Sequence, residues 1–205
     1  MTLPPLLALG AALACGVCAG LIALHDNRRL RLALLAVQYA AATTLTSISI
    51  PIAVAAVKLV GGLIACSILG ITLTRLPDRP GPRRGGSIPS GRLFRVTAVL
   101  LVSVAGWGLS RETWMGTLSL IGPASLGSAL LMTLGLLQLG ISDTPFSVGL
   151  GMLTTLAGFE IAYASVEPSL AVLALLAMVH IGIALIVSYL ILVVGKAQSI
   201  PKPQP

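Results

Sequence analysis

The chain of 205 residues is 56% hydrophobic and only 9% charged, and its mean hydropathy is +1.01. An ordinary water-soluble domain carries about 25% charged residues, so this composition excludes such a domain and indicates a membrane protein. The net charge is +7, but the basic residues flank long apolar runs and are not interleaved with aromatic side chains. That pattern argues against a nucleic-acid-binding protein.

Seven apolar stretches are long enough to cross the hydrocarbon core of a bilayer, which takes about 20 helical residues. They are residues 3–24, 31–49, 51–74, 94–110, 115–139, 146–165 and 169–194. We therefore predict an all-α, polytopic membrane protein with about seven transmembrane helices. Because these stretches occupy most of the chain, no room is left for a soluble domain.

The basic residues fall on one side of the predicted membrane. The breaks after the first, third and last stretch hold Arg28, Arg29, Arg31, Arg75, Arg79, Arg83, Arg84, Arg92, Arg95, Lys196 and Lys202. The breaks on the other side hold Arg111 alone. The positive-inside rule then predicts an amino terminus outside and a carboxyl terminus in the cytoplasm, in the cell inner membrane. No positive charge precedes the first stretch, so we expect it to be retained as a helix and not cleaved as a signal peptide.

One break, residues 76–92, is rich in Pro, Gly and Arg and is predicted to be a non-helical cytoplasmic loop. It separates a three-helix part, residues 1–75, from a four-helix part, residues 93–195, which a tail at 196–205 follows. The arginines of the loop either serve only as a topology signal or form a docking strip for an acidic partner or anionic lipid.

Three ionisable residues lie inside predicted spans: Lys58, Glu160 and His180. Such a group near the bilayer centre costs about 2.5–3.5 kcal/mol on insertion scales, so each needs a reason. A rise of 1.5 Å per residue places them about 12, 8 and 16 Å below the outer surface. A proton-conducting subunit needs such a layer, and we predict a proton-relay role for all three. Alternatively, Lys58 snorkels, Glu160 reaches the surface, and His180 only bonds one helix to another.

Two cysteines, Cys15 and Cys18, have the spacing of a redox or metal motif but no further ligands, so we expect them in the apolar core. Glycines that let helices approach closely are expected at Gly16, Gly20, Gly61 and Gly62. The sequence contains no nucleophile with a base, phosphate loop or metal cluster. We therefore expect no catalytic residue, metal or cofactor in this chain.

Five further polar residues carry weaker signals. Gln38, Gln138 and Tyr163 either extend a hydrated path or simply bond across helices. Glu112 and Glu167 fall in predicted outer loops, where solvation accounts for them.

The last three spans resemble a known family. The motif Gly-Phe-Glu-Ile at 158–161, with Ala-Ser at 164–165, resembles the carboxylate helix of the K subunit of respiratory complex I. Residues 181–185 resemble the final helix of that subunit. A longer, seven-helix relative, the membrane component E of hydrogenase-4 and formate hydrogenlyase complexes, fits the whole chain better. The resemblance covers about residues 30–75 and 125–194, and elsewhere it is one of topology. The third helix of that relative carries an intramembrane lysine, as Lys58 does here, before an exit like residues 75–77.

The resemblance implies a non-catalytic membrane subunit of a hydrogenase-4, formate hydrogenlyase or complex I-like oxidoreductase. It implies antiporter-like membrane subunits and peripheral iron–sulfur subunits as partners, and a contribution to proton or ion movement coupled to electron transfer. Glu160 carries over as a relay carboxylate. When residues 181–185 are aligned with the family's final helix, the family's second glutamate falls at Met178, so this chain lacks that carboxylate. His180 points about 200° around the helix from Met178. Either the proton path runs through His180, or part of it is lost.

Two alternatives remain open. A stand-alone small transporter or ion carrier would use the same three charges as a substrate site, although we see no internal repeat of the kind common in such folds. A purely structural anchor for a cytoplasmic enzyme would not need these charges at all.

Overall fold

The structure is a computed structural model that describes residues 5–75, 91–111, 122–166 and 169–199. These residues form seven α-helices and no strand, which confirms the all-α prediction. The helices are α1 (Pro5–Leu24), α2 (Arg28–Thr46), α3 (Ile52–Thr74), α4 (Arg92–Leu109), α6 (Pro123–Ile141), α7 (Pro145–Ala164) and α8 (Leu170–Ser199). All except α2, whose first turn carries three arginines, are long and apolar enough to cross a membrane.

Some predicted boundaries were wrong. The second helix begins at Arg28, before the predicted residue 31, because the Asn27 side chain caps it by accepting from the Arg29 and Leu30 amides at 3.0 and 3.4 Å. The last helix continues past residue 194 to Ser199, so the predicted tail begins as helix. Some predictions fall outside the described residues: the start of the fifth stretch at 115, residues 76–90 of the predicted loop, Glu112 and Glu167.

The cap at Asn27 supports a testable stability difference. An Asn27→Ala variant loses the side-chain oxygen that accepts from two backbone amides, and we expect it to be about 1 kcal/mol less stable. Asn27→Ser keeps a capping oxygen and should remain close to the wild type. Thermal unfolding of the purified chain in detergent measures both, and equal loss in the two variants would contradict the capping role.

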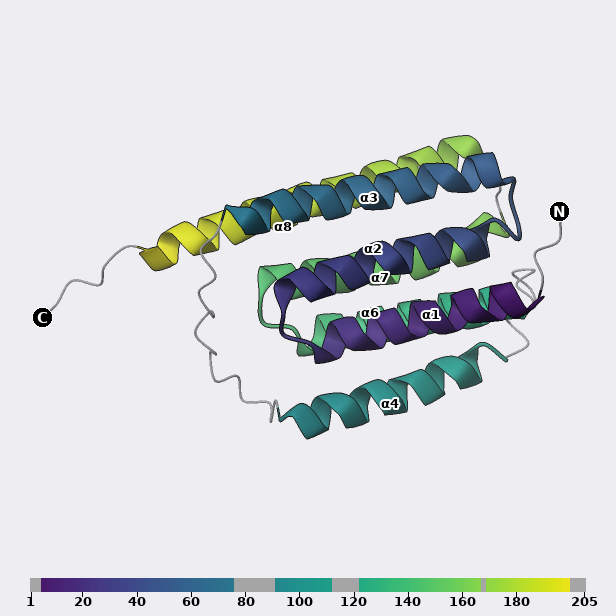
Figure 1. Ribbon diagram of the computed structural model, residues 1–205, viewed down its shortest axis with the longest axis horizontal. Coiled ribbons are helices and arrows are strands. Elements are labelled where there is room, and N and C mark those ends of the chain that lie inside the picture. The colour runs from purple at the N-terminus through teal and green to yellow at the C-terminus, as the bar shows by residue number, and fades with distance from the viewer. Residues whose placement is uncertain (1–4, 76–90, 112–121, 167–168, 200–205) are drawn as a thin grey trace, which may run out of the picture.

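The helices form two layers of three with one helix added. Helices α1, α2 and α3 pack against α6, α7 and α8 respectively, and α4 packs against α1 and α6 (Figure 1). The predicted parts at 1–75 and 93–195 therefore share one bundle. Within each pair the two helices run in the same direction, so α2 is parallel to α7 and α3 is parallel to α8 (Figure 1).

One end of this bundle is basic. At this end, on the left in Figure 1, three helices begin (α2, α4 and α7) and four end (α1, α3, α6 and α8). These helix ends carry Arg28, Arg92 and Lys196, and Arg95 pairs with Asp26 there at 3.0 Å. We call it the basic end.

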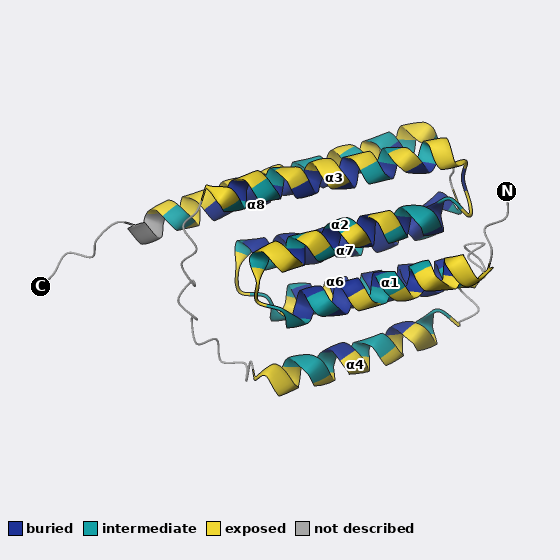
Figure 2. Ribbon diagram, viewed as in Figure 1, coloured by how far each residue is buried: buried dark blue, intermediate teal, exposed yellow. Residues whose placement is uncertain are grey.

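The low hydropathy of α2 follows from its place in the bundle. It contacts α1, α3, α6 and α7, and its buried face includes the polar residues Arg31, Gln38, Tyr39 and Thr46. These side chains face protein and not lipid, where polar groups are costly. In contrast, α4 lies at the edge and buries only Val99 and Gly106, so most of its surface is exposed or partly exposed (Figure 2).

Small residues set the closest helix contacts. A Cβ added at Gly61 would lie 2.9 Å from the Cβ of Ala177, so α3 and α8 touch there. A Cβ at Gly62 would lie 2.6 Å from the ring of Tyr39, which occupies the space that the glycine leaves. Close approach was predicted at this pair, and the structure confirms it. Cys15 and Cys18 are buried in the core, as predicted.

Candidate functional site

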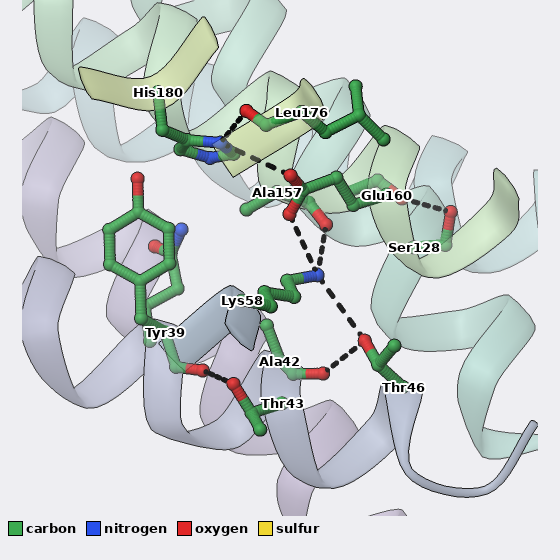
Figure 3. A network of polar contacts seen from close by, with 12 residues as sticks. Tyr39, Ala42, Thr43, Thr46, Lys58, Ser128, Ala157, Glu160, Leu176 and His180 are labelled. Atoms are coloured by element: carbon green, nitrogen blue, oxygen red, sulfur yellow. Dashed lines mark hydrogen bonds and ion pairs between the residues drawn. The ribbon is translucent and has the colours of Figure 1, made fainter. Parts of the chain in front are cut away.

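Three predicted site residues from three different helices meet inside the bundle. The Nζ of Lys58 on α3 lies 3.3 Å from Oε2 of Glu160 on α7, and Nδ1 of His180 on α8 lies 3.2 Å from Oε1 of the same carboxylate (Figure 3). The exposed fractions of these residues are 3%, 1% and 2% respectively. We call Lys58, Glu160 and His180 the ionic cluster.

The ammonium group of Lys58 points into the protein. Besides its ion pair with Glu160, it donates hydrogen bonds to the carbonyl of Ala157 at 3.1 Å and to Oγ1 of Thr46 at 3.3 Å (Figure 3). The Thr46 hydroxyl in turn donates to the carbonyl of Ala42 at 2.8 Å. The alternative that Lys58 snorkels to the surface was wrong.

The carboxylate of Glu160 is positioned by tight packing of α7 on α6. A Cβ at Gly158 would lie 2.8 Å from the Leu131 side chain and the Met132 amide nitrogen, so no larger residue fits there. The Ser128 hydroxyl of α6 donates to the Gly158 carbonyl at 2.9 Å. This contact fixes the turn of α7 that precedes Glu160. The alternative that this carboxylate reaches the surface was wrong, since it is buried between Lys58 and His180.

The imidazole of His180 is held on one nitrogen. Its Nδ1 lies 3.1 Å from the carbonyl of Leu176 and 3.2 Å from Glu160. Because a carbonyl can only accept, this contact assigns the hydrogen of the neutral ring to Nδ1. The ring of Tyr39 meets the imidazole edge-on, with centroids 5.5 Å apart (Figure 3). The contact between His180 and Glu160 joins α8 to α7, so it agrees with the helix-bonding alternative as well as with a relay.

Met178 does not belong to this cluster. It is 66% exposed, on the opposite side of α8 from His180, which is 2% exposed. A carboxylate at Met178 would therefore point away from Glu160. The inward position next to Glu160 is taken by His180.

The weaker predictions have mixed outcomes. Gln138 bonds across helices, since its Nε2 donates to the Ser147 carbonyl at 3.2 Å. Tyr163 stacks on Phe159 of its own helix, 5.5 Å between centroids, and does not join the cluster. Gln38 is fully buried, and its side-chain amide has no hydrogen-bond partner among the described residues.

Sequence reasoning did not identify Tyr39, Thr46 or Ser128 as part of the site. None of them is charged, and single hydroxyls are common in membrane helices. One signal was available for two of them, because Tyr39 and Thr46 are seven residues apart and therefore lie on one face of α2. Arg31, counted as a loop charge, is in fact buried and donates to the Ser147 hydroxyl at 2.8 Å.

The ionic cluster is chemically suited to exchange a proton. Burying an ion pair costs desolvation free energy that its attraction does not reliably recover, so such a pair is weak evidence for a purely stabilising role. Here one carboxylate contacts both an ammonium and an imidazole, and a proton can pass between Oε1 and Nδ1 without a large movement. Within the described ranges, no group of three or more His, Cys, Asp and Glu side chains could hold a metal ion.

Comparisons with protein-family models, curated proteins and solved structures each found no match for this chain. The class of protein is defined by its own sequence and fold. Six apolar helices of spanning length indicate a multi-pass, all-α membrane protein. A buried ionic cluster lies between its two three-helix layers.

Proposed function

We propose that this chain is a non-catalytic membrane subunit of a hydrogenase-4, formate hydrogenlyase or complex I-like oxidoreductase, contributing to proton or ion translocation coupled to electron transfer. The observation that carries the proposal is the carboxylate of Glu160 held between Lys58 and His180, all three buried. Charged groups at such depth are costly and mark proton and ion pathways in membrane proteins.

The proposed topology uses all seven helices. The amino terminus lies outside, the carboxyl terminus lies in the cytoplasm, and the membrane is the inner, cytoplasmic membrane. The clustering of Arg28, Arg92 and Lys196 at the basic end supports a cytoplasmic location of that end. Helix α2 crosses despite its arginines because its polar face is turned into the bundle.

Each member of the ionic cluster has a role in this proposal. Glu160 exchanges protons with groups on a neighbouring antiporter-like subunit. The charge of Lys58, 3.3 Å away, sets the proton affinity of that carboxylate. His180 relays protons at Glu160 Oε1. Electron transfer takes place on separate iron–sulfur subunits, which hold the cofactors.

Replacing Glu160 with glutamine tests the relay. Glutamine keeps the size of the side chain and, unlike leucine, an oxygen that can accept from Lys58, so we expect assembly and electron transfer to be retained. It cannot take up a proton, so we expect coupled proton translocation to fall by about 10²-fold or more. Proton uptake and electron transfer measured together in membrane vesicles from the native host give this result. Asp143→Asn, which changes an exposed carboxylate at the basic end, is the control. Normal pumping by the Glu160→Gln variant would disprove the assignment.

A stand-alone carrier is the second candidate, and one observation favours it. The ionic cluster lies at the interface of two three-helix layers whose paired helices run in the same directions, and transporters commonly bind substrates at the interface between two halves of the fold. Mild-detergent purification of the tagged chain separates the two candidates. Co-purifying antiporter-like and iron–sulfur subunits support the subunit, whereas a chain that purifies alone and transports after reconstitution supports the carrier.

The third alternative, a structural anchor, makes the opposite prediction about the cluster. It expects a variant with Lys58, Glu160 and His180 all replaced by apolar residues to keep full activity. Loss of proton translocation in that variant, with the complex still assembled, would exclude the anchor.

A further inference from the structure

A second set of polar groups lies between the ionic cluster and the basic end. Near the start of both helices, the guanidinium of Arg31 on α2 donates to the hydroxyl of Ser147 on α7 at 2.8 Å. Gln38 and Thr154 are each seven residues further on. Seven residues are about two turns, or about 10.5 Å, and return to nearly the same face. Because α2 and α7 are parallel and in contact, Gln38 and Thr154 lie at one level, on the faces where Arg31 and Ser147 meet.

These groups are buried without partners. Gln38, Tyr39 and Thr154 are 0% exposed and His180 is 2% exposed. Several of their side-chain atoms have no hydrogen-bond partner among the described residues: the oxygen and nitrogen of Gln38, the hydroxyls of Tyr39 and Thr154, and Nε2 of His180. Buried polar atoms in native proteins are nearly always satisfied, by protein or by ordered water.

Thr154 differs from the other threonines of the bundle. Its neighbour Thr155 donates to the carbonyl of Gly151 at 2.9 Å, and Thr46 and Thr133 make the same bond to their own helices. The hydroxyl of Thr154 makes no such local bond, although it is completely buried. It is therefore free to bind water at the level of Gln38.

His180 connects these groups to the ionic cluster. Its Nδ1 faces Glu160 and Leu176, and in the neutral ring Nε2 carries a lone pair that can accept a proton. The Tyr39 ring next to the imidazole comes from the residue that follows Gln38 on α2 (Figure 3). The order from the basic end is thus Arg31 with Ser147, Gln38 with Thr154, Tyr39 with His180, and Glu160.

We propose that Gln38, Tyr39 and Thr154 bind a file of water molecules that carries protons between the basic end and the ionic cluster. This route rests on the proposed relay role of Glu160 and assigns the side of the membrane with which the cluster exchanges. A water gives a proton to His180 Nε2 as its O–H bond breaks, and the Nδ1–H bond breaks as a new O–H bond forms on Glu160 Oε1. The next water toward Arg31 reprotonates the hydroxide. Rotation of the ring then turns the Nε2–H toward Glu160 and the unprotonated Nδ1 toward the water, so that the next transfer runs with the two nitrogens exchanged.

Apolar isosteres on α2 and α7 test the route. Gln38→Leu and Thr154→Val remove unpartnered polar atoms and keep side-chain size, so we expect an unchanged or higher melting temperature together with proton translocation lowered by about tenfold or more. Thr155→Val is the matched control, because the hydroxyl it removes bonds only within α7, and Thr154→Ser should retain translocation. Translocation, electron transfer and melting temperature are measured on the whole complex from native membranes.

The outcomes separate this route from the proposed function. Wild-type translocation in Gln38→Leu and Thr154→Val, with Glu160→Gln blocked, would overturn the route and leave the relay role of Glu160 intact. A loss of translocation that follows a loss of melting temperature, or that Thr155→Val shares, would also overturn it. Normal translocation in Glu160→Gln would overturn the proposed function and the route together.

Discussion

A Glu160→Leu variant is expected to lose about 3–5 kcal/mol of stability, because it leaves the ammonium of Lys58 buried without its carboxylate. Thr46 and Ala157 still accept hydrogen bonds from Lys58, but neither carries a charge. The loss should appear as a lower midpoint of thermal unfolding for the purified chain in detergent.

The double variant Lys58→Met, Glu160→Leu distinguishes charge from packing. Replacing both members of a buried pair with apolar residues of similar size is often neutral or stabilising, so the double variant should recover most of the loss. The control is Asp26→Asn, which breaks the exposed pair with Arg95 at the basic end and should cost no more than about 1 kcal/mol. A double variant as unstable as Glu160→Leu alone would show that the charge pair does not cause the loss.

Gly135→Ala should be the most damaging of the single-methyl substitutions in the tightly packed α6–α7 contact. A Cβ at Gly135 would meet the Thr155 hydroxyl and would lie 2.7 Å from the Thr155 backbone nitrogen and 3.0 Å from the Gly151 carbonyl oxygen. Backbone atoms cannot rotate away as a side chain can, so the two helices must separate. We expect a loss of about 1–3 kcal/mol, the usual cost of overpacking, in spite of the better helix propensity of alanine.

Gly140→Ala in the same helix provides the matched control. A Cβ there has no neighbour within 4 Å, so only the helix propensity changes, and the variant should be as stable as the wild type or up to about 1 kcal/mol more stable. Thermal unfolding of both variants in one detergent gives the comparison. Equal stabilities for Gly135→Ala and Gly140→Ala would contradict the close packing of α6 on α7.

The ionic cluster shows how far sequence reasoning reaches in a membrane protein. Charge is so costly in lipid that Lys58, Glu160 and His180 stood out against their apolar surroundings, and counting residues from the helix ends placed them in the same half of the membrane. Depth in the membrane, however, does not tell which helices are neighbours. Which helices are neighbours in the plane of the membrane depends on side-chain packing among many similar apolar faces, and that information is spread over the whole chain.

Residues without charge were harder to recognise. Tyr39 and Thr46 complete the site, and Gln38 and Thr154 lie next to it, but amides and hydroxyls are common in membrane helices and only their surroundings distinguish them. Thr154 and Thr155 are adjacent and chemically identical. One is unpartnered in the interior and the other bonds to Gly151, a difference that depends on which face of α7 meets α2 and which meets α6.

The sequence by itself determined the all-α class, the positions of most helices and the three ionisable candidates, because hydropathy and charge are local properties that a bilayer selects directly. Only the tertiary structure decided that these three residues meet, that Met178 faces outward while His180 faces Glu160, and that α2 turns its polar face into the bundle. These features depend on how helices pair, and the pairing is set by contacts such as Gly61 with Ala177, between residues far apart in the chain.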